Sequence, residues 1–122
     1  MDTKKTLSLN EFLYDERVFV EVPWLGELTR RVRQRAVCAD GFSLSIQASE
    51  EYFSEPGEEP GMPYRSVQIG YPSRPERLLG IYEFNGTYPF VPIEVVEKIV
   101  RKHGGIIGME VKTEAGPEFT AF

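Results

Sequence analysis

The residue types that most often carry out catalysis are scarce in this chain. It contains one histidine, His103, and one cysteine, Cys38, whereas a catalytic triad or a two-histidine metal site needs a larger set. His103 falls at the last turn of a predicted helix, where a cation is stabilised by the helix dipole. Cys38 falls in a predicted strand, where we expect a half-buried thiol, although arginines nearby in sequence could lower its pKa. We therefore predict no catalytic residue and no enzyme activity.

The carboxylates and glycines do not follow the spacing of a metal or nucleotide site. Five glutamates lie between residues 50 and 59, but they lack the regular spacing of oxygen ligands in a calcium loop. The glycines match neither the dinucleotide fingerprint nor the phosphate loop. Gly104 and Gly105 follow a predicted helix instead of preceding one, so the amides there point away from any anion. We expect no cofactor and no bound metal.

Two charged segments are the candidate interaction sites. The first, the acidic segment, interleaves carboxylates with two aromatic residues and consists of Glu50, Glu51, Tyr52, Phe53, Glu55, Glu58 and Glu59. The second, the arginine segment, contains Arg30, Arg31, Arg33 and Arg35. Both could be solvated surface, a sheet face opposite a mobile loop. The functional alternative is a polarised surface whose acidic side docks on a basic partner, with the two aromatic residues as anchors.

Length and composition limit the class of protein. A chain of 122 residues forms one domain with a single core, and its net charge of −5 argues against direct binding to nucleic acid. No apolar run reaches the ~18 residues of a membrane helix, and the N-terminus lacks the apolar region of a secretory signal. One cysteine fits a reducing compartment. We expect a soluble protein of the cytoplasm.

Alternating apolar side chains predict several strands. Residues 18–22 alternate up to Pro23, residues 67–71 alternate up to Pro72, and residues 42–46 give the clearest strand pattern. A short helix through about Asp15, capped by Asn10, should precede them.

Residues 25–38 fit two structures. Their apolar side chains recur at helical spacing, but Asp40-Gly41 follows at once and favours a two-residue hairpin turn. We favour a strand paired with residues 42–46. In one continuous strand Arg31, Arg33 and Arg35 would share a face.

Asn85-Gly86 predicts a second hairpin. Both residues accept the positive φ of a type I′ turn, so Phe84 and Thr87 should form a hydrogen-bonded pair. Pro89 has no N–H to donate, so the ladder should stop after two pairs or place Pro89 on a sheet edge.

The spacing of residues 92–103 predicts the principal helix. Pro92 suits the first helical position, acidic residues lead and basic ones follow, and Gly104 supplies a left-handed C-cap. The apolar positions that should meet between this helix and the sheet are Val96, Ile99, Val100, Phe42, Leu44, Ile46, Val67 and Ile69.

Two segments should lack packed structure. One is a mobile acidic loop over about residues 50–63, which contain three prolines and two glycines. The other is a C-terminal tail over about residues 112–122. The sum is a single α+β domain, residues 1–122, with a mainly antiparallel sheet of five to seven strands, hairpins at Asp40-Gly41 and Asn85-Gly86, and one principal C-terminal helix.

Residues 42–105 carry a set of motifs: an SIQAS strand, a YRSVQIGYPS strand and a YPFVPIEVVEKIVRKHGG helix. This set resembles a group of small uncharacterised proteins from tailed phages and prophages. The resemblance covers about half of the chain and leaves out residues 1–41 and the tail. It implies a phage-encoded protein that acts in a bacterial host, and it implies no activity or catalytic residue.

Small acidic phage proteins without a catalytic constellation are often inhibitors of host machinery, and anti-CRISPR and other anti-defence proteins are examples. By analogy at the level of class, we expect a non-enzymatic binding protein that occludes the basic nucleic-acid-binding surface of a host protein. One alternative is a small-molecule or nucleotide-binding module with a pocket lined by Tyr64, Tyr71, Tyr82 and Tyr88. Another is a phage structural or assembly accessory protein that works as a homo-oligomer.

Overall fold

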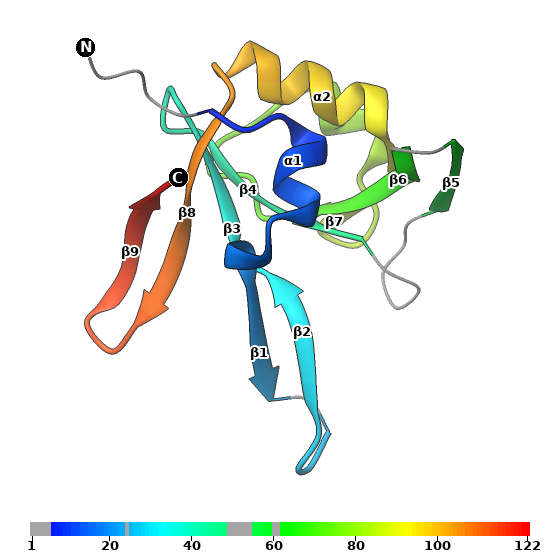
Figure 1. Cartoon of the computed structure of the whole chain (residues 1–122). Helices are drawn as coiled ribbons and strands as arrows, with labels where there is room; N and C mark the ends of the chain where they lie inside the picture. The colour runs from blue at the N-terminus through cyan, green and yellow to red at the C-terminus, as the bar shows by residue number, and fades with distance from the viewer. Residues whose placement is uncertain (1–5, 24, 49–54, 60–61) are drawn as a thin grey trace.

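The computed structural model of the chain describes residues 6–23, 25–48, 55–59 and 62–122 (Figure 1). The elements, in chain order, are α1 (Leu9–Tyr14), η1 (Glu16–Val18), β1 (Phe19–Pro23), β2 (Thr29–Arg33), β3 (Arg35–Cys38), β4 (Ser43–Gln47), β5 (Glu55–Glu59), β6 (Met62–Gly70), η2 (Arg77–Tyr82), β7 (Thr87–Pro92), α2 (Ile93–Lys102), β8 (Ile106–Thr113) and β9 (Gly116–Ala121). The elements η1 and η2 are 3-10 helices.

Two antiparallel sheets make up most of the described chain (Figure 1). The main sheet has seven strands in the order β5-β6-β4-β3-β8-β9, with β7 also paired to β6. Strands β1 and β2 form a separate hairpin that projects from the body of the protein. Every pairing within the described residues is antiparallel. The predicted α+β class with a mainly antiparallel sheet is confirmed.

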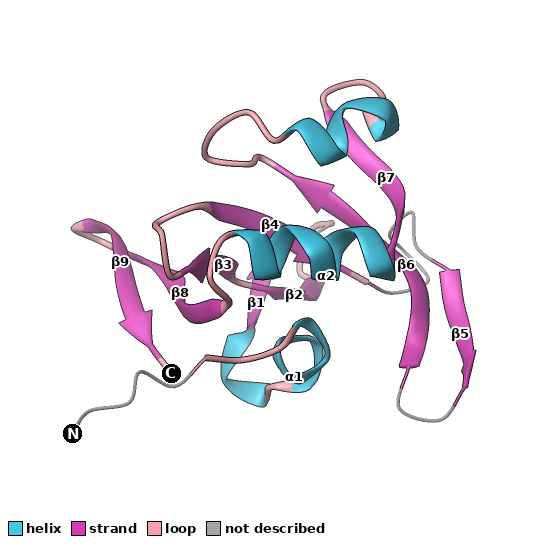
Figure 2. Cartoon of the chain, turned by 90° about the horizontal axis from the view of Figure 1, so that it is seen from above, coloured by secondary structure: helices cyan, strands magenta, loops and turns pink. Residues whose placement is uncertain are grey.

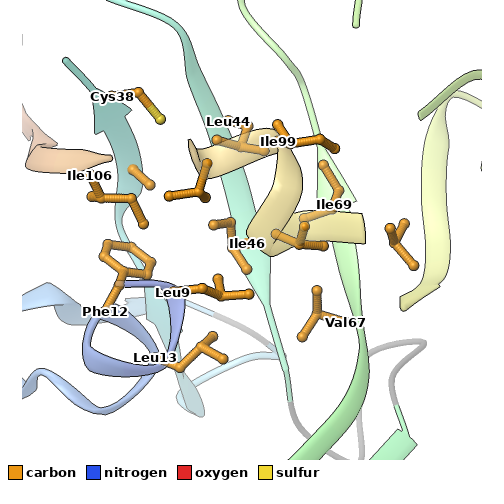
Figure 3. Close-up of a cluster of buried hydrophobic side chains, with 14 of the residues drawn as sticks. Leu9, Phe12, Leu13, Cys38, Leu44, Ile46, Val67, Ile69, Ile99 and Ile106 are labelled. Carbon is orange, nitrogen blue, oxygen red and sulfur yellow. The ribbon is translucent and has the colours of Figure 1, made fainter. Parts of the chain in front are cut away.

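Both α-helices cover one face of the main sheet (Figures 1 and 2). Helix α2 contacts β6, β7 and α1, and side chains of both helices meet those of the strands in one core (Figure 3). All the apolar residues predicted for the helix–sheet contact are buried, and Ile99 is 0% exposed. Full burial of an aliphatic side chain of this size contributes about 1.5–3 kcal/mol, so this contact is a main source of stability.

Helix α2 begins and ends within one residue of the predicted positions. Pro92 is its N-cap residue and His103 its C-cap residue. Gly104 and Gly105 follow with φ of +89° each, a conformation that glycine adopts without strain. A Cβ atom on Gly104 would lie 2.8 Å from the Cβ of Ala39. The chain therefore needs glycine at residue 104 for its conformation and for the close approach to the β3–β4 turn.

Helix α1 is capped by Ser8 and not by the predicted Asn10. The Ser8 hydroxyl accepts a hydrogen bond from the Glu11 N–H at 3.2 Å, and the Glu11 carboxylate accepts one from the Ser8 N–H at 3.0 Å. This reciprocal capping box has the spacing Ser-x-x-Glu, which is visible in the sequence. Phe12 and Leu13 lie on the buried side of this helix.

The hairpin at Asp40-Gly41 is confirmed, but the long strand before it is not. Strands β3 and β4 pair around the turn, with Gly41 at φ +91°. Residues 29–38 form two strands, because the chain leaves the β1–β2 hairpin at Gln34 and enters the main sheet as β3. The arginines on β2 and β3 therefore belong to two different sheets.

The turn at Asn85-Gly86 is also confirmed. Phe84 and Thr87 exchange both backbone hydrogen bonds, at 2.8 and 3.1 Å, and Asn85 and Gly86 have φ of +50° and +84°. The ladder stops after this one pair and not after two, because residues 77–82 form the 3-10 helix η2 instead of a strand. Strand β7 pairs with β6 instead.

The predictions of an acidic loop and of a C-terminal tail are wrong for most of the residues that the structure describes in these two segments. Residues 55–59 form β5, which pairs with the first half of β6, and residues 62 and 63 begin β6. Residues 49–54 and 60–61 lie outside the described part of the chain. Strand β9 pairs with β8 over its whole length, so residues 112–121 are not a free tail. Most β9 side chains are exposed, so the sequence offered no alternation of buried residues there.

Candidate functional site

A charged cluster lies at the C-terminal end of α2. The His103 side chain is 9% exposed. Its Nδ1 is 2.6 Å from Oδ2 of Asp40, and its Nε2 is 2.8 Å from Oε1 of Glu76. Asp40 and Glu76 are 63 and 27 residues away from His103 in the chain, so no local spacing pattern indicated them. We call His103, Asp40, Glu76, Arg74 and Lys102 the His103 cluster.

The cluster joins residues from three parts of the fold. Asp40 comes from the β3–β4 turn, and its backbone N–H also donates to the His103 carbonyl at 3.2 Å. Glu76 is the N-cap residue of η2, where its Oε2 accepts the Leu78 N–H at 3.0 Å. Lys102, in α2, places its Nζ 3.0 Å from the same Oε2. The ion pairs therefore connect the turn, the start of η2 and the end of α2.

Aromatic packing fixes the plane of the imidazole. The rings of His103 and Phe42 are stacked, with centroids 4.0 Å apart and planes inclined by 15°. Arg74 donates to Oδ2 of Asp40 at 2.9 Å, and its guanidinium carbon lies 5.7 Å from the centroid of Phe42. The imidazole is thus held by a ring on its face and by carboxylates on both nitrogens.

The surroundings stabilise both carboxylates in their ionised form. Burial alone would raise the pKa of Glu76, but hydrogen bonds from the Leu78 N–H, His103 and Lys102 outweigh it and lower that pKa to about 2. Burial likewise works against ionised Asp40, but the Phe42 N–H, His103 and Arg74 together hold its pKa below the usual value. Both groups are therefore anions at neutral pH.

In this arrangement both ring nitrogens of His103 have a carboxylate partner. An ionised carboxylate only accepts hydrogen bonds, so both ring nitrogens of His103 are satisfied only when both donate, as in the imidazolium ion. A ring in that state has no free nitrogen lone pair for a substrate or a metal. The part of the chain that the structure describes also has no group of three or more His, Cys, Asp or Glu that could hold a metal ion.

Cys38 is more deeply buried than predicted. It is 0% exposed in β3, where we expected a half-buried thiol. Burial, with a smaller contribution from Asp40, raises the pKa of Cys38 to about 12. Arg74 acts in the opposite direction but does not offset the burial, and the side chain is a neutral, inert thiol at physiological pH.

The arginine segment does not form one basic surface. Arg31 is exposed on β2, where it forms an ion pair with Glu16 and lies over the Phe19 ring at 4.0 Å. Arg30 lies on the opposite face of the same hairpin, in register with Val22. Arg35 belongs to β3 and donates to Ser43 and to the carbonyl of Tyr71. Arg31 and Arg33 both lie over the Phe19 ring, but Arg35 belongs to the other sheet, so the predicted face shared by all three is wrong.

Arg33 is a structural residue. It is 8% exposed, and its guanidinium donates to the Leu13 carbonyl at 3.1 and 2.9 Å and to the Ala48 carbonyl at 3.0 Å. The cation also lies 4.7 Å from the centroid of Phe19, and burial lowers its pKa. Arg33 ties α1 to the end of β4.

Only part of the acidic segment lies among the described residues. Glu50, Glu51, Tyr52 and Phe53 fall outside them, whereas Glu55, Glu58 and Glu59 belong to β5. Strand β5 is the last strand at one end of the main sheet. Within the described residues no strand pairs with its outer side, so the acidic residues follow a sheet edge.

The four tyrosines of the predicted pocket do not line the groove between the helices. That groove has a volume of about 250 Å³ and is lined by Ser8, Leu9, Asn10, Glu97, Val100 and Arg101. Tyr71 is 73% exposed, and the other three tyrosines are half-buried against the core. The tip of the β1–β2 hairpin, in contrast, exposes Leu25 and Leu28.

Comparison with known proteins found no matching family model, no matching curated protein and no matching solved structure. The resemblance to phage proteins therefore stays a prediction. Among the described residues, no helix is long and apolar enough to cross a membrane.

Proposed function

We propose that this chain is a non-enzymatic, phage-encoded binding protein that docks on a basic surface of a bacterial host protein. The observation that supports the proposal is the position of β5 (Glu55–Glu59) at an edge of the main sheet. An edge strand presents unpaired backbone groups to a partner, and this strand carries three carboxylates. A partner that binds this edge could therefore form backbone hydrogen bonds and ion pairs with the same strand.

A basic partner explains why carboxylates are gathered there. Several like charges on one strand repel one another, and a cationic surface removes that repulsion. Charged residues on an edge strand also prevent association between copies of a protein, which is the alternative explanation. The net charge of −5 favours a basic partner over nucleic acid. If the partner handles nucleic acid, the carboxylates take the place of phosphates and occlude its binding groove, as in an anti-CRISPR or other anti-defence inhibitor.

The state of the two most reactive side chains supports a binding role over catalysis. His103 has a carboxylate on each ring nitrogen, and Cys38 is a fully buried thiol. Neither is available to a substrate in this conformation. The arginine segment is the weaker candidate for a partner site, because Arg33 acts within the core and Arg31 is already paired with Glu16.

The test compares two triple charge reversals. The partner is first captured from bacterial lysate, identified by mass spectrometry and purified. Its association rate with the wild type is then measured against a variant in which Glu55, Glu58 and Glu59 are changed to Lys. The matched control reverses three glutamates outside β5, Glu27, Glu114 and Glu118, which are exposed, and so makes the same change in net charge.

The proposal expects the β5 reversal to slow association by tenfold or more at low salt, on the scale of electrostatic steering. Added salt should reduce the difference because it screens the charges. The control reversal should have a much smaller effect. Equal association rates for the wild type and a folded β5 variant would contradict the proposal.

The projecting β1–β2 hairpin favours a second candidate function, that of a phage assembly accessory protein. Leu25 and Leu28 are 66% and 62% exposed at its tip, and an apolar tip on a projection is typical of a contact that assembly buries. Light scattering of the wild type and of a Leu25→Ser, Leu28→Ser variant tests this function. Assembly that the double substitution abolishes would support it, and a monomer at all concentrations in both would reject self-assembly.

A further inference from the structure

The His103 cluster joins three segments that regular secondary structure does not hold together. Its contacts run from the β3–β4 turn through Asp40, from the start of η2 through Glu76, and from the end of α2 through His103 itself. Few backbone hydrogen bonds reinforce the cluster, and those from Ala39 and Asp40 to Gly105 and His103 join only the turn and the end of α2. The start of η2 is connected to the end of α2 through Glu76, and Arg74, two residues earlier, pairs with Asp40 of the turn.

The number of protons on the imidazole decides whether both contacts are favourable. Each carboxylate accepts hydrogen bonds and cannot donate one. When both ring nitrogens carry a proton, both contacts, at 2.6 and 2.8 Å, are charge-assisted hydrogen bonds. When one proton is lost, a nitrogen lone pair faces a carboxylate oxygen at that distance, and one contact becomes repulsive.

The other charged groups around the ring are paired with the same two carboxylates. Arg74 pairs with Asp40 and Lys102 pairs with Glu76. Cys38, in the adjacent strand β3, is a buried thiol whose pKa of about 12 keeps it neutral. Phe42, on the face of the ring, carries no charge.

We propose that His103, Asp40 and Glu76 form a proton-operated clamp, which is closed while the imidazole carries two protons and opens when it loses one. In the closed state the clamp holds the start of η2 and the β3–β4 turn against the end of α2. In the open state one carboxylate separates from the ring, and the segment that carries it moves more freely. The fold itself persists, because the core under α2 does not depend on this contact.

The protein has one histidine, so nuclear magnetic resonance can follow the clamp without ambiguity. Correlations between ring protons and ring nitrogens report how many nitrogens are protonated, and the titration runs from about pH 5 to about pH 8, where histidines usually change charge. We expect two protonated nitrogens on the acidic side of a single midpoint. Backbone amides of the β3–β4 turn, the start of η2 and the end of α2 should shift with the same midpoint.

Amide hydrogen exchange measures the release. A charge-assisted hydrogen bond corresponds to an equilibrium factor of about tenfold or more. Exchange at Leu78 and Asp40, whose N–H groups donate to Glu76 and to the His103 carbonyl, should therefore become faster by that factor above the midpoint, after correction for the intrinsic effect of pH. Amides on β6, which do not contact the cluster, serve as the internal reference.

Three substitutions separate the clamp from a merely structural role. Asp40→Asn keeps an oxygen for the Phe42 N–H, which Oδ1 now accepts at 2.9 Å, and Glu76→Gln keeps one for the Leu78 N–H. Each removes one anion from the ring, so each should move the midpoint to lower pH. His103→Gln should abolish the coupled pH step. Lys98→Gln, an exposed substitution on α2, removes a charge outside the cluster and should leave the midpoint in place.

The outcomes decide the proposal in either direction. A ring with one protonated nitrogen over the whole range from about pH 5 to about pH 8 would overturn it. So would equal midpoints in the wild type, Asp40→Asn and Glu76→Gln, provided that these proteins are folded. If the midpoints move but exchange at Leu78 and Asp40 shows no step, the cluster binds its proton without opening, and the clamp is likewise rejected.

Discussion

Gly108 of β8 lies directly beneath the ring of Phe119 on β9. A Cβ atom built on Gly108 would come within 2.5 Å of Cε1 of Phe119 and within 2.4 Å of the Thr120 carbonyl oxygen. The ring covers a residue that has no side chain, and the strands approach each other closely at this point. Phe119 is paired with Glu110, two residues along β8, so its ring lies diagonally over Gly108, and such a contact stabilises a strand pair that has few other buried contacts.

Gly108→Ala should therefore displace β9. No methyl group fits between the strands without moving the ring or the backbone, and overpacking of this kind costs about 1–3 kcal/mol. Hydrogen exchange of the β9 amides should become faster, while exchange in β4 and β6 changes little. Gly80→Ala is the matched control, because a Cβ on Gly80 meets no atom within 4 Å. Unchanged protection of β9 in the Gly108 variant would contradict the close packing.

Ile99→Ala should destabilise the protein by about 2–5 kcal/mol, because it leaves a cavity between α2 and the sheet. Ile99 is 0% exposed, whereas Ile81 is 87% exposed on η2, so Ile81→Ala provides a control with the same change in side chain. Urea unfolding measures both free energies. A loss below about half a kcal/mol at Ile99 would be inconsistent with a packed helix–sheet contact.

Arg33→Lys should cost about 2 kcal/mol even though the charge is kept. A single ammonium group cannot reproduce the guanidinium fork that reaches the carbonyls of both Leu13 and Ala48, and an unsatisfied buried acceptor costs about 1–3 kcal/mol. Arg31→Lys, at an exposed position on β2, should cost less than about 1 kcal/mol. Equal losses at the two positions would show that Arg33 is not the link between α1 and β4.

Stability should fall in acid through Glu76. Its pKa is about 2 in the folded protein and 4.5 as the ordinary value, so its contribution is fully present above about pH 4.5 and is lost as the pH falls towards about 2. The difference corresponds to on the order of 3 kcal/mol. In acid titrations of the unfolding free energy, wild type and Glu76→Gln should therefore converge below about pH 4.5. Parallel curves would argue against the pairing, and Glu118→Gln on β9 serves as the control.

Local patterns in the sequence predicted the elements whose structure depends on nearby residues. Helix α2, the turns at Asp40-Gly41 and Asn85-Gly86, and strand β4 all follow from periodicity and turn chemistry within a short window. Strand β9 escaped prediction because a strand exposed on most positions has no alternation of buried and exposed residues. The sequence of β5 indicated a loop because it contains proline and glycine, which are rare within strands. An edge strand tolerates both residues.

The His103 cluster could not be predicted for a different reason. Asp40, Glu76 and His103 are brought together only by the packing of a turn, a 3-10 helix and the end of α2, and each residue has an ordinary local explanation. Asp40 fits a turn, Glu76 fits an N-cap and His103 fits the last turn of a helix. The prediction for the arginine segment is wrong for the opposite reason. Its residues are neighbours in the sequence, which suggests one face, but the chain passes from one sheet to the other at Gln34.

The burial of Cys38 makes this residue a natural probe of local unfolding in the main sheet. A thiol reagent modifies only the exposed thiolate, so a side chain that is 0% exposed reacts only during moments when β3 separates from its neighbours. The labelling rate of the native protein thus counts those openings without any engineered probe. The ratio of the labelling rate in the native protein to the rate in denaturant would report how often the centre of the main sheet opens. Cys38 is the one cysteine of the chain, so the signal comes from a single position.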